Sequence, residues 1–232
     1  MENPLILAIE TSGKLGGIAL FKEKLLVEIT IRSKESYSKI LFKILERIKE
    51  FYPFSLEEID YYVINLGPGS FTGLRIGMSV LKALDLAHKK PVIGIYSLEA
   101  LAFNFPKVTL PLACLVDAYT QEVFFALYRW KNFELVPEIA PCCIPLEKVK
   151  NFIKEETLFL SETLEKWESF LREELKGFFL KPELSVNLSP GLLAKVAYYK
   201  LKKNLVEFKT GEEILPLYLK SSEAERKLLK KI

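Results

Sequence analysis

The succession of strand-like and helix-like segments is the feature of this sequence that most restricts its fold. Three short runs rich in aliphatic and β-branched residues come first and predict an antiparallel meander. Strand-like and helical segments then alternate, which is typical of a mixed sheet with helices packed on it. The expected elements are strands at 6–9, 16–21, 25–31, 61–66 and 91–96, and helices at 35–52, 72–88 and 98–103.

The same pattern starts again after residue 105. A second meander is expected, followed by a loop because Pro137, Pro141 and Pro145 interrupt the pattern. The expected elements are strands at 112–116, 123–129, 133–136 and 157–160, and helices at 146–155, 163–175 and 190–203. We therefore expect an α/β fold with two domains, residues 1–105 and 106–232. A charged helix expected at 223–232 is a candidate to pack back on the first domain.

Composition excludes several classes of protein. Half of the 232 residues are apolar and 27% are charged, which allows a buried core and excludes a disordered chain. No run approaches the roughly 18 apolar residues that a membrane span needs. The start of the chain has no basic segment, so it reads as a first strand rather than a signal peptide. Three cysteines and one histidine, His88, provide neither a disulfide framework nor a zinc site, and we expect a cytoplasmic protein without a bound metal.

A glycine-rich segment, Gly67 to Gly77 (GPGSFTGLRIG), follows an apolar strand and opens a helix. The free N–H groups at such a position can bind an anion. The segment lacks the Gly-Lys-Ser/Thr ending of a P-loop, however, and the glycine spacing of a dinucleotide fingerprint. Two interpretations stay open: a phosphate-binding loop, and a tight turn in which Ser70 or Thr72 caps the helix.

The helices at 35–52 and 72–88 carry more apolar surface than one neighbour would cover. At 100° per residue, apolar and small residues span roughly 140° of the first helix and roughly 220° of the second. Either the helices pack tightly on each other and on the sheet, or their outer faces contact another protein. Arg75 also calls for a compensating carboxylate or a partner's charge, because a cation in the first turn opposes the helix dipole. We predict an interface at Tyr37, Leu41, Ile44, Ile48, Leu74, Arg75, Met78 and Leu81.

Five motifs, in order along the chain, resemble those of the TsaB (YeaZ) family of bacterial tRNA threonylcarbamoyladenosine biosynthesis. They are ILAIETS at 6–12, GPGSFTGLRIG at 67–77, SLEALA at 97–102, Asp117-Ala118 with Glu122, and PLYL at 216–219. The family's signature loop corresponds to Gly67, Pro68, Gly69, Ser70, Phe71, Thr72 and Gly73. Two positions differ from the usual family pattern, Tyr37 and Tyr119, and both fall outside this loop.

The resemblance implies two actin-like lobes of the ASKHA, ribonuclease-H-like class. It implies a non-catalytic scaffold or activator that pairs with the transferase TsaD, supports the ATPase TsaE, and helps to modify adenosine 37 of tRNA. In the family, the first two long helices form the contact with TsaD, and a homodimer through the same helices is possible when the partner is absent. A nucleotide at the shared interface is also possible.

Local chemistry favours the non-catalytic role. With His88 alone, the chain cannot provide the paired histidines that hold the metal in TsaD-like enzymes. The turn from Asp117 to Glu122 has no glycine, although actin-like ATPases use glycine in the corresponding phosphate-binding hairpin. We interpret Asp117 as a turn former, and Glu10, Thr11 and Ser12 as a structural remnant of the first phosphate loop. The alternatives are a small actin-fold kinase that binds ATP through Gly67–Gly77 and Glu10, and, less favoured, a peptidase.

A basic stretch closes the sequence. Residues 195–232 hold ten Lys and Arg against five Glu. This excess predicts a solvated helical face, with a tRNA-facing patch as the alternative.

Overall fold

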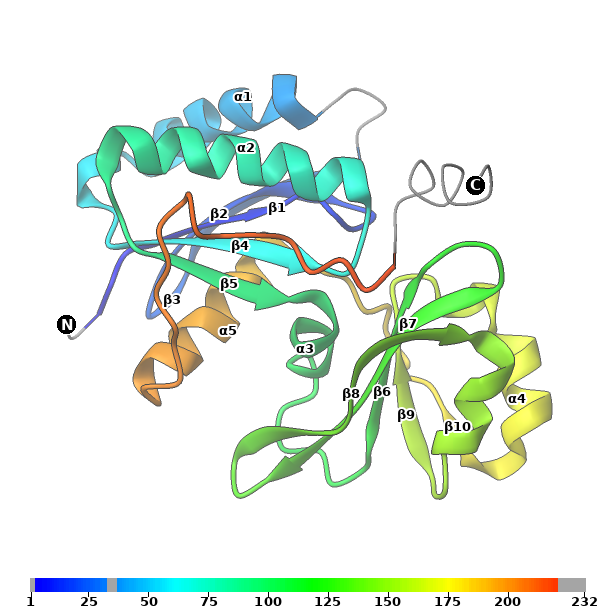
Figure 1. Cartoon of the computed structure of the whole chain (residues 1–232). Coiled ribbons are helices and arrows are strands. Elements are labelled where there is room, and N and C mark those ends of the chain that lie inside the picture. The colour runs from blue at the N-terminus through cyan, green and yellow to red at the C-terminus, as the bar shows by residue number, and fades with distance from the viewer. Residues whose placement is uncertain (1–2, 33–36, 221–232) are drawn as a thin grey trace.

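The computed structural model describes residues 3–32 and 37–220, and within these ranges the strands form two five-stranded sheets (Figure 1). The first sheet has the order β3-β2-β1-β4-β5. Strands β1, β2 and β3 form an antiparallel meander, whereas β4 runs parallel to β1 and β5 runs parallel to β4. The bounds are β1 (Ile6–Glu10), β2 (Gly16–Lys22), β3 (Lys24–Ile31), β4 (Tyr61–Gly67) and β5 (Val92–Tyr96).

The second sheet repeats this layout strand for strand. Its order is β8-β7-β6-β9-β10, with an antiparallel meander followed by two parallel strands. The bounds are β6 (Leu112–Asp117), β7 (Glu122–Lys131), β8 (Glu134–Pro145), β9 (Thr157–Leu160) and β10 (Phe179–Leu180). The expected restart of the pattern is confirmed, and the two mixed sheets have the layout of a two-lobed, actin-like α/β fold.

Helices cover both faces of the first sheet (Figure 1). Helices α1 (Tyr37–Phe51) and α2 (Phe71–His88) lie side by side on one face, and α5 (Pro190–Lys202) packs on the other. Helix α3 (Ser97–Ala102) lies between the two sheets, and α4 (Glu168–Leu175) accompanies the second sheet. Short 3₁₀ helices complete the chain at Leu56–Glu58, Leu146–Phe152, Leu164–Lys166 and Lys176–Phe178. Among the described residues, no helix has both the length and the apolar character that a membrane crossing needs.

The apolar core is continuous between the lobes. Ala8 of β1, Leu101 of α3 and Cys114 of β6 are completely buried in one cluster, which also includes apolar residues of α5. A second cluster lies between the first sheet and the helix pair α1–α2, and a third lies beneath α4. Because α3 is buried in this shared cluster, its apolar contacts hold the two sheets together.

Strand β8 occupies the residues that were expected to form a proline-rich loop, so that prediction is wrong. It contains Pro137, Pro141 and Pro145, yet it pairs with β7 along its whole length, with two register shifts. The physical reason is its position at the edge of the sheet, where a proline without an N–H group leaves no central ladder bond unmade. Two expected helices also differ, because 146–152 is a 3₁₀ helix and 163–175 is divided into a 3₁₀ turn and α4.

Residues 190–220 return to the first lobe, which differs from the domain division expected from the sequence. Helix α5 packs on β1, β2 and β3. The segment after it, 203–220, which we call the return segment, pairs Lys209 with Val92 through backbone hydrogen bonds of 2.8 and 3.0 Å. The boundary near residue 105 does separate the two sheets, but residues 106–232 do not stay together as a second domain. The helix expected at 223–232 lies outside the described residues.

Candidate functional site

The signature loop packs directly on the turn that follows β1. The backbone N–H of Ser70 donates to the carbonyl of Ser12 at 3.0 Å, and the Thr11 hydroxyl donates to the carbonyl of Gly73 at 2.8 Å. A Cβ atom at Gly73 would lie 2.0 Å from the Thr11 carbonyl oxygen, and one at Gly69 would lie 2.8 Å from the Ser12 hydroxyl. Glycine is therefore required at these two positions because the backbones approach too closely for a side chain.

The loop is a tight strand-to-helix turn. Ser70 is the N-cap of α2, and its hydroxyl accepts the Gly73 N–H at 3.2 Å. Gly67, at a φ of +92°, donates its N–H to the Asn65 side chain at 2.8 Å. The Gly67–Pro68 peptide bond is cis. Of the two sequence interpretations, the cap by Ser70 is confirmed, and the N–H groups of Gly67, Ser70 and Gly73 all donate to protein oxygens.

A buried polar cluster centred on Glu10 lies beneath the loop. The Glu10 carboxylate accepts hydrogen bonds from the Ser12 N–H, from the Ser12 hydroxyl at 2.8 Å, from the Gly13 N–H at 3.0 Å and from the Asn65 amide at 2.5 Å. Ser97, at the start of α3, donates to the carbonyl oxygen of the same Asn65 side chain at 2.9 Å. Burial raises the pKa of Glu10, and these hydrogen bonds act in the opposite direction. The Glu10 carboxylate and the Asn65 side chain together link β1, β4 and α3.

The hairpin between β6 and β7 is held from within the chain. The Asp117 carboxylate accepts the Tyr119 N–H at 2.9 Å, which confirms Asp117 as a turn former, and it pairs with Lys166 at 2.5 Å. Lys220, at the end of the described return segment, contacts the Ala118 carbonyl at 2.7 Å and the Glu122 carboxylate at 2.5 Å. Tyr119, Thr120 and Gln121 all have positive φ values, in a turn where a glycine would be free of strain.

A cleft of about 360 Å³ lies where the loop, the β6–β7 hairpin and the segment after β9 meet. Glu162 is its most buried charged group. Burial raises the pKa of Glu162, although its carboxylate accepts two backbone hydrogen bonds, from Leu188 and from Lys14. The other lining residues are Ser12, Gly13, Lys14, Gly69, Ser70, Leu115, Val116, Asp117, Tyr119, Ser161 and Thr163. Within 3–32 and 37–220, no group of three or more His, Cys, Asp or Glu side chains could hold a metal ion.

The predicted interface residues lie mostly inside the chain. The six aliphatic and methionine members are at most 5% exposed, and five of them belong to the cluster beneath the helix pair: Leu41, Ile44, Ile48, Met78 and Leu81, with Leu74 beside them near the loop. Tyr37 is partly buried and donates its hydroxyl to the Ile31 carbonyl at 3.1 Å. The predicted interface residues of α2 are buried because this helix has three neighbours: the sheet, α1 and the return segment. Ile214 of the return segment belongs to the same cluster.

Arg75 is the one predicted interface residue that is fully at the surface. Its guanidinium lies over the Phe71 ring, 3.9 Å from the ring centroid, and Phe71 in turn contacts the Tyr218 ring at 5.1 Å. Among the described residues, no carboxylate pairs with Arg75. The charge in the first turn of α2 is therefore balanced by an aromatic face rather than by the expected ion pair.

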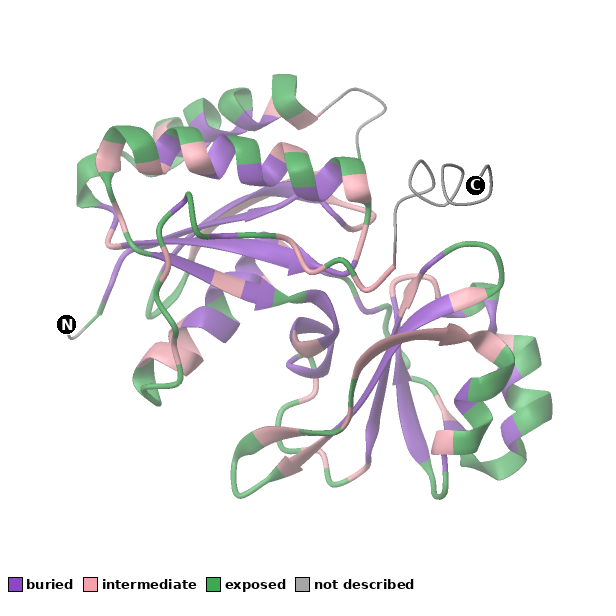
Figure 2. Cartoon of the chain, viewed as in Figure 1, coloured by how far each residue is buried: buried purple, intermediate pink, exposed green. Residues whose placement is uncertain are grey.

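The outward surface of the helix pair, which we call the outer helix face, consists of other residues (Figure 2). Phe42 of α1 is 49% exposed and Leu86 of α2 is 79% exposed. We define this face by eight exposed residues, Lys39, Phe42, Lys43 and Glu46 of α1, with Arg75, Ser79, Ala83 and Leu86 of α2. Phe42 could have been found from the sequence, because it lies outside the apolar stripe of its helix. No local pattern identifies Glu162 or Lys220, whose partners are distant in the sequence.

Comparison with protein families identifies the chain. The sequence model of the protein family described as tRNA N6-adenosine threonylcarbamoyltransferase (TsaD) matches residues 24–226. A curated relative from Bacillus subtilis, named tRNA threonylcarbamoyladenosine biosynthesis protein TsaB, is 28% identical over 96% of each chain. The TsaB protein of Haemophilus influenzae is 24% identical over 98% of each chain.

Solved structures show the same fold. A Pseudomonas aeruginosa protein described as similar to the peptidase YeaZ superposes with a TM-score of 0.78 at 20% identity, and it covers 94% of this chain. A second structure, YeaZ from the same organism, superposes with a TM-score of 0.74. With its signature loop, its two matching lobes and its full-length relatives, the chain belongs to the TsaD family of tRNA N6-adenosine threonylcarbamoyltransferases, and within it to the TsaB (YeaZ) proteins.

Proposed function

We propose that this protein acts in tRNA threonylcarbamoyladenosine biosynthesis as a non-catalytic subunit that pairs with TsaD and supports TsaE. The names of the relatives give the pathway. The observation that carries the non-catalytic role is that the groups at the two expected phosphate-loop positions bind other parts of this chain. Glu10 directs its carboxylate to protein donors, and the β6–β7 hairpin has Lys220 bound where an actin-like ATPase would present a glycine hairpin to phosphate.

The outer helix face is the surface that we propose for TsaD. Phe42 and Leu86 expose apolar side chains there, and Arg75 offers a cation that no carboxylate of the described chain neutralises. Exposed apolar groups together with a cation that the chain itself does not pair are typical of a protein contact. The same face offers a route to a homodimer when TsaD is absent.

The pairing can be tested by size-exclusion chromatography with light scattering, on this protein alone and mixed with TsaD of the same source. We expect a stable heteromer, and we expect it to modify tRNA when TsaE, ATP and the threonylcarbamoyl donor are added. The matched variant is Leu86→Glu, which places a charge on the outer helix face at a position that contributes little to the core. It should lose the complex and keep the fold.

Two results would overturn the proposal. One is the absence of any complex at low and at moderate salt. The other is tight, magnesium-dependent ATP binding and turnover by the isolated chain in calorimetric titration, which would favour the alternative of an actin-fold kinase. In the proposed role the protein works in the cytoplasm and meets tRNA through the complex.

A further inference from the structure

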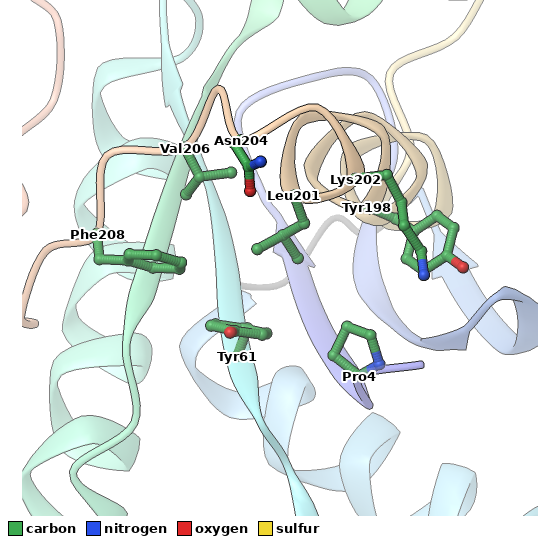
Figure 3. A pocket seen from close by; sticks show the side chains of 8 residues that line it. All are labelled: Pro4, Tyr61, Tyr198, Leu201, Lys202, Asn204, Val206 and Phe208. Carbon is green, nitrogen blue, oxygen red and sulfur yellow. The ribbon is translucent and has the colours of Figure 1, made fainter. Parts of the chain in front are cut away.

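An apolar groove of about 630 Å³ lies between the β2–β3 hairpin and α5, on the side of the first sheet away from the outer helix face. Phe21 and Tyr198 form part of its floor, with ring centroids 5.4 Å apart, and Leu25 is 45% exposed at its margin. The groove adjoins a smaller hollow of about 360 Å³ (Figure 3). Tyr198 and Lys202 line both the groove and the hollow. In that hollow, Tyr61 stacks on Phe208 with 5.4 Å between ring centroids.

The groove begins at an unprotected sheet edge. Strand β3 is eight residues long, and among the described residues it pairs only with β2. The other three edges are blunted: Lys209 of the return segment pairs beside β5, β8 contains three prolines, and β10 has two residues. About half of the backbone N–H and C=O groups of β3 therefore point outward without a strand partner, and native proteins normally cover such an edge.

The rim of the groove is basic. Lys24 lies at one side, and Lys195 and Lys202 lie two turns apart along α5. Lys24 and Lys195 form no ion pair with the described residues. Two glutamates also line the groove, but the Glu28 carboxylate accepts the Gly191 N–H at 2.9 Å at the N-terminus of α5, where the helix dipole offsets its charge. Glu23, in the turn before β3, is the remaining acid.

From this geometry we infer that β3 and the groove bind an extended segment of a partner protein that carries both apolar and acidic side chains on the one face turned toward α5. The segment adds a strand to β3 through backbone hydrogen bonds. Because successive side chains of a strand point to opposite faces, one set enters the apolar groove beside α5. The carboxylates of this same set lie within reach of Lys24 and Lys195, which line the groove. The site is separate from the outer helix face, so this inference does not depend on the TsaD contact.

The inference can be tested by fluorescence anisotropy with the full chain and a dye-labelled synthetic decapeptide. Its odd positions are valine and glutamate in turn and its even positions are threonine, so that the apolar and acidic side chains fall on one face of the strand. We expect saturable binding in the micromolar range. A peptide with lysine in place of glutamate tests the charge. A peptide methylated on alternate backbone nitrogens tests the added strand, because methylation removes the N–H donors. Both should bind at least about tenfold more weakly.

The double variant Lys24→Glu with Lys195→Glu tests the location, and Lys148→Glu with Lys154→Glu is the matched control on exposed lysines elsewhere. We expect about a tenfold loss of affinity in the first and none in the second. Hydrogen exchange should show slower exchange in residues 24–31 when the peptide is bound. Equal losses in the two variants, equal binding of the lysine or methylated peptide, or no saturation would each overturn the inference. So would a homodimer of the wild type that the Lys24/Lys195 double variant abolishes, because a second copy would then be the occupant.

Discussion

Glu162, which follows β9 of the second sheet, accepts a 3.1 Å hydrogen bond from the backbone N–H of Lys14, in the turn between β1 and β2 of the first sheet. Its other carboxylate oxygen accepts the Leu188 N–H at 3.0 Å, just before α5. One side chain therefore connects a segment of the second lobe to two segments that lead into the first. Lys14 adds an ion pair with Glu165 at 3.0 Å.

Replacing Glu162 by alanine should lower the free energy of unfolding by about 2 kcal/mol, because two partly buried N–H groups lose their acceptor. Urea unfolding followed by circular dichroism measures this loss. Glu156→Ala is the control, since Glu156 is exposed and no hydrogen bond or ion pair of its side chain is found in the described structure. Equal stability of the two variants would contradict the connecting role of Glu162.

The stability should also depend on pH through Glu162. Burial raises the pKa of the Glu162 carboxyl in the folded chain above 4.5, the ordinary value of a glutamate. Its charged neighbours are Glu10, which also raises the pKa, and Lys14, which lowers it. The folded state therefore holds the proton more tightly, and the contribution of this group is fully present below pH 4.5 and is lost as the pH rises through the folded pKa. In urea titrations at pH 4.5 and 7.5, wild type should lose stability relative to Glu162→Gln, which cannot ionise. A difference between the two that stays constant with pH would contradict the raised pKa.

Gly73→Ala should destabilise the protein by about 3 kcal/mol, because its new Cβ atom would lie 2.0 Å from the Thr11 carbonyl and force α2 away from β1. Gly177→Ala offers a matched control, since a Cβ atom there meets nothing within 4 Å. Thermal unfolding of both variants checks the prediction. If the two substitutions had the same small effect, the close approach would not explain the signature glycine.

The helix pair should respond differently on its two faces. Met78 is 5% exposed, so Met78→Asp should destabilise the chain by about 3 kcal/mol or more rather than act on a partner alone. Phe42→Glu, on the outer helix face, should keep the thermal midpoint within a few degrees and weaken binding to TsaD. Calorimetric titration and thermal unfolding distinguish these outcomes. A folded Met78→Asp variant that loses only TsaD binding would restore Met78 as a contact residue.

Lys220→Ala should lower the free energy of unfolding by about 2 kcal/mol, because the side chain is only 12% exposed and its ammonium binds both the Ala118 carbonyl and the Glu122 carboxylate. Limited proteolysis should then cut the β6–β7 hairpin more rapidly. Lys154→Ala, on an exposed lysine outside the hairpin, is the control. Unchanged cleavage at residues 117–122 would show that the hairpin holds its shape without Lys220.

Most of the strands could be predicted from the sequence because their apolar runs are local. Strand β9, Thr157–Leu160, has its expected bounds. All four of its residues are buried, and such a short continuous apolar run is typical of a buried strand. The start of β8 was predicted at 133–136, but its continuation to Pro145 was predicted as a loop. A proline is tolerated in a strand at a sheet edge, and that position is decided by pairing partners distant in the sequence.

The helix pair illustrates a different limit. Placing the residues at 100° intervals correctly shows that α2 is apolar over most of its circumference. It does not show how many other elements pack against the helix. The return segment supplies the third one: the Gly211 N–H donates to the Asp85 carboxylate at 2.8 Å, and Ile214 is buried against the helix pair. Nothing near residue 80 in the sequence indicates that residues 211–217 will lie there. The glycines of the signature loop, by contrast, were found by pattern, and only the structure explains them through Thr11 and Ser12.

The return of residues 190–220 also fixes the order in which the molecule can be completed during synthesis. The first lobe begins at residue 6, but its sheet has one apolar face uncovered until α5 has left the ribosome. The second sheet, at residues 112–180, emerges before α5 does. The lobe translated first is therefore the lobe finished last, and a nascent chain halted near residue 185 would present the bare surface of β1 and β2 to the cell's chaperones.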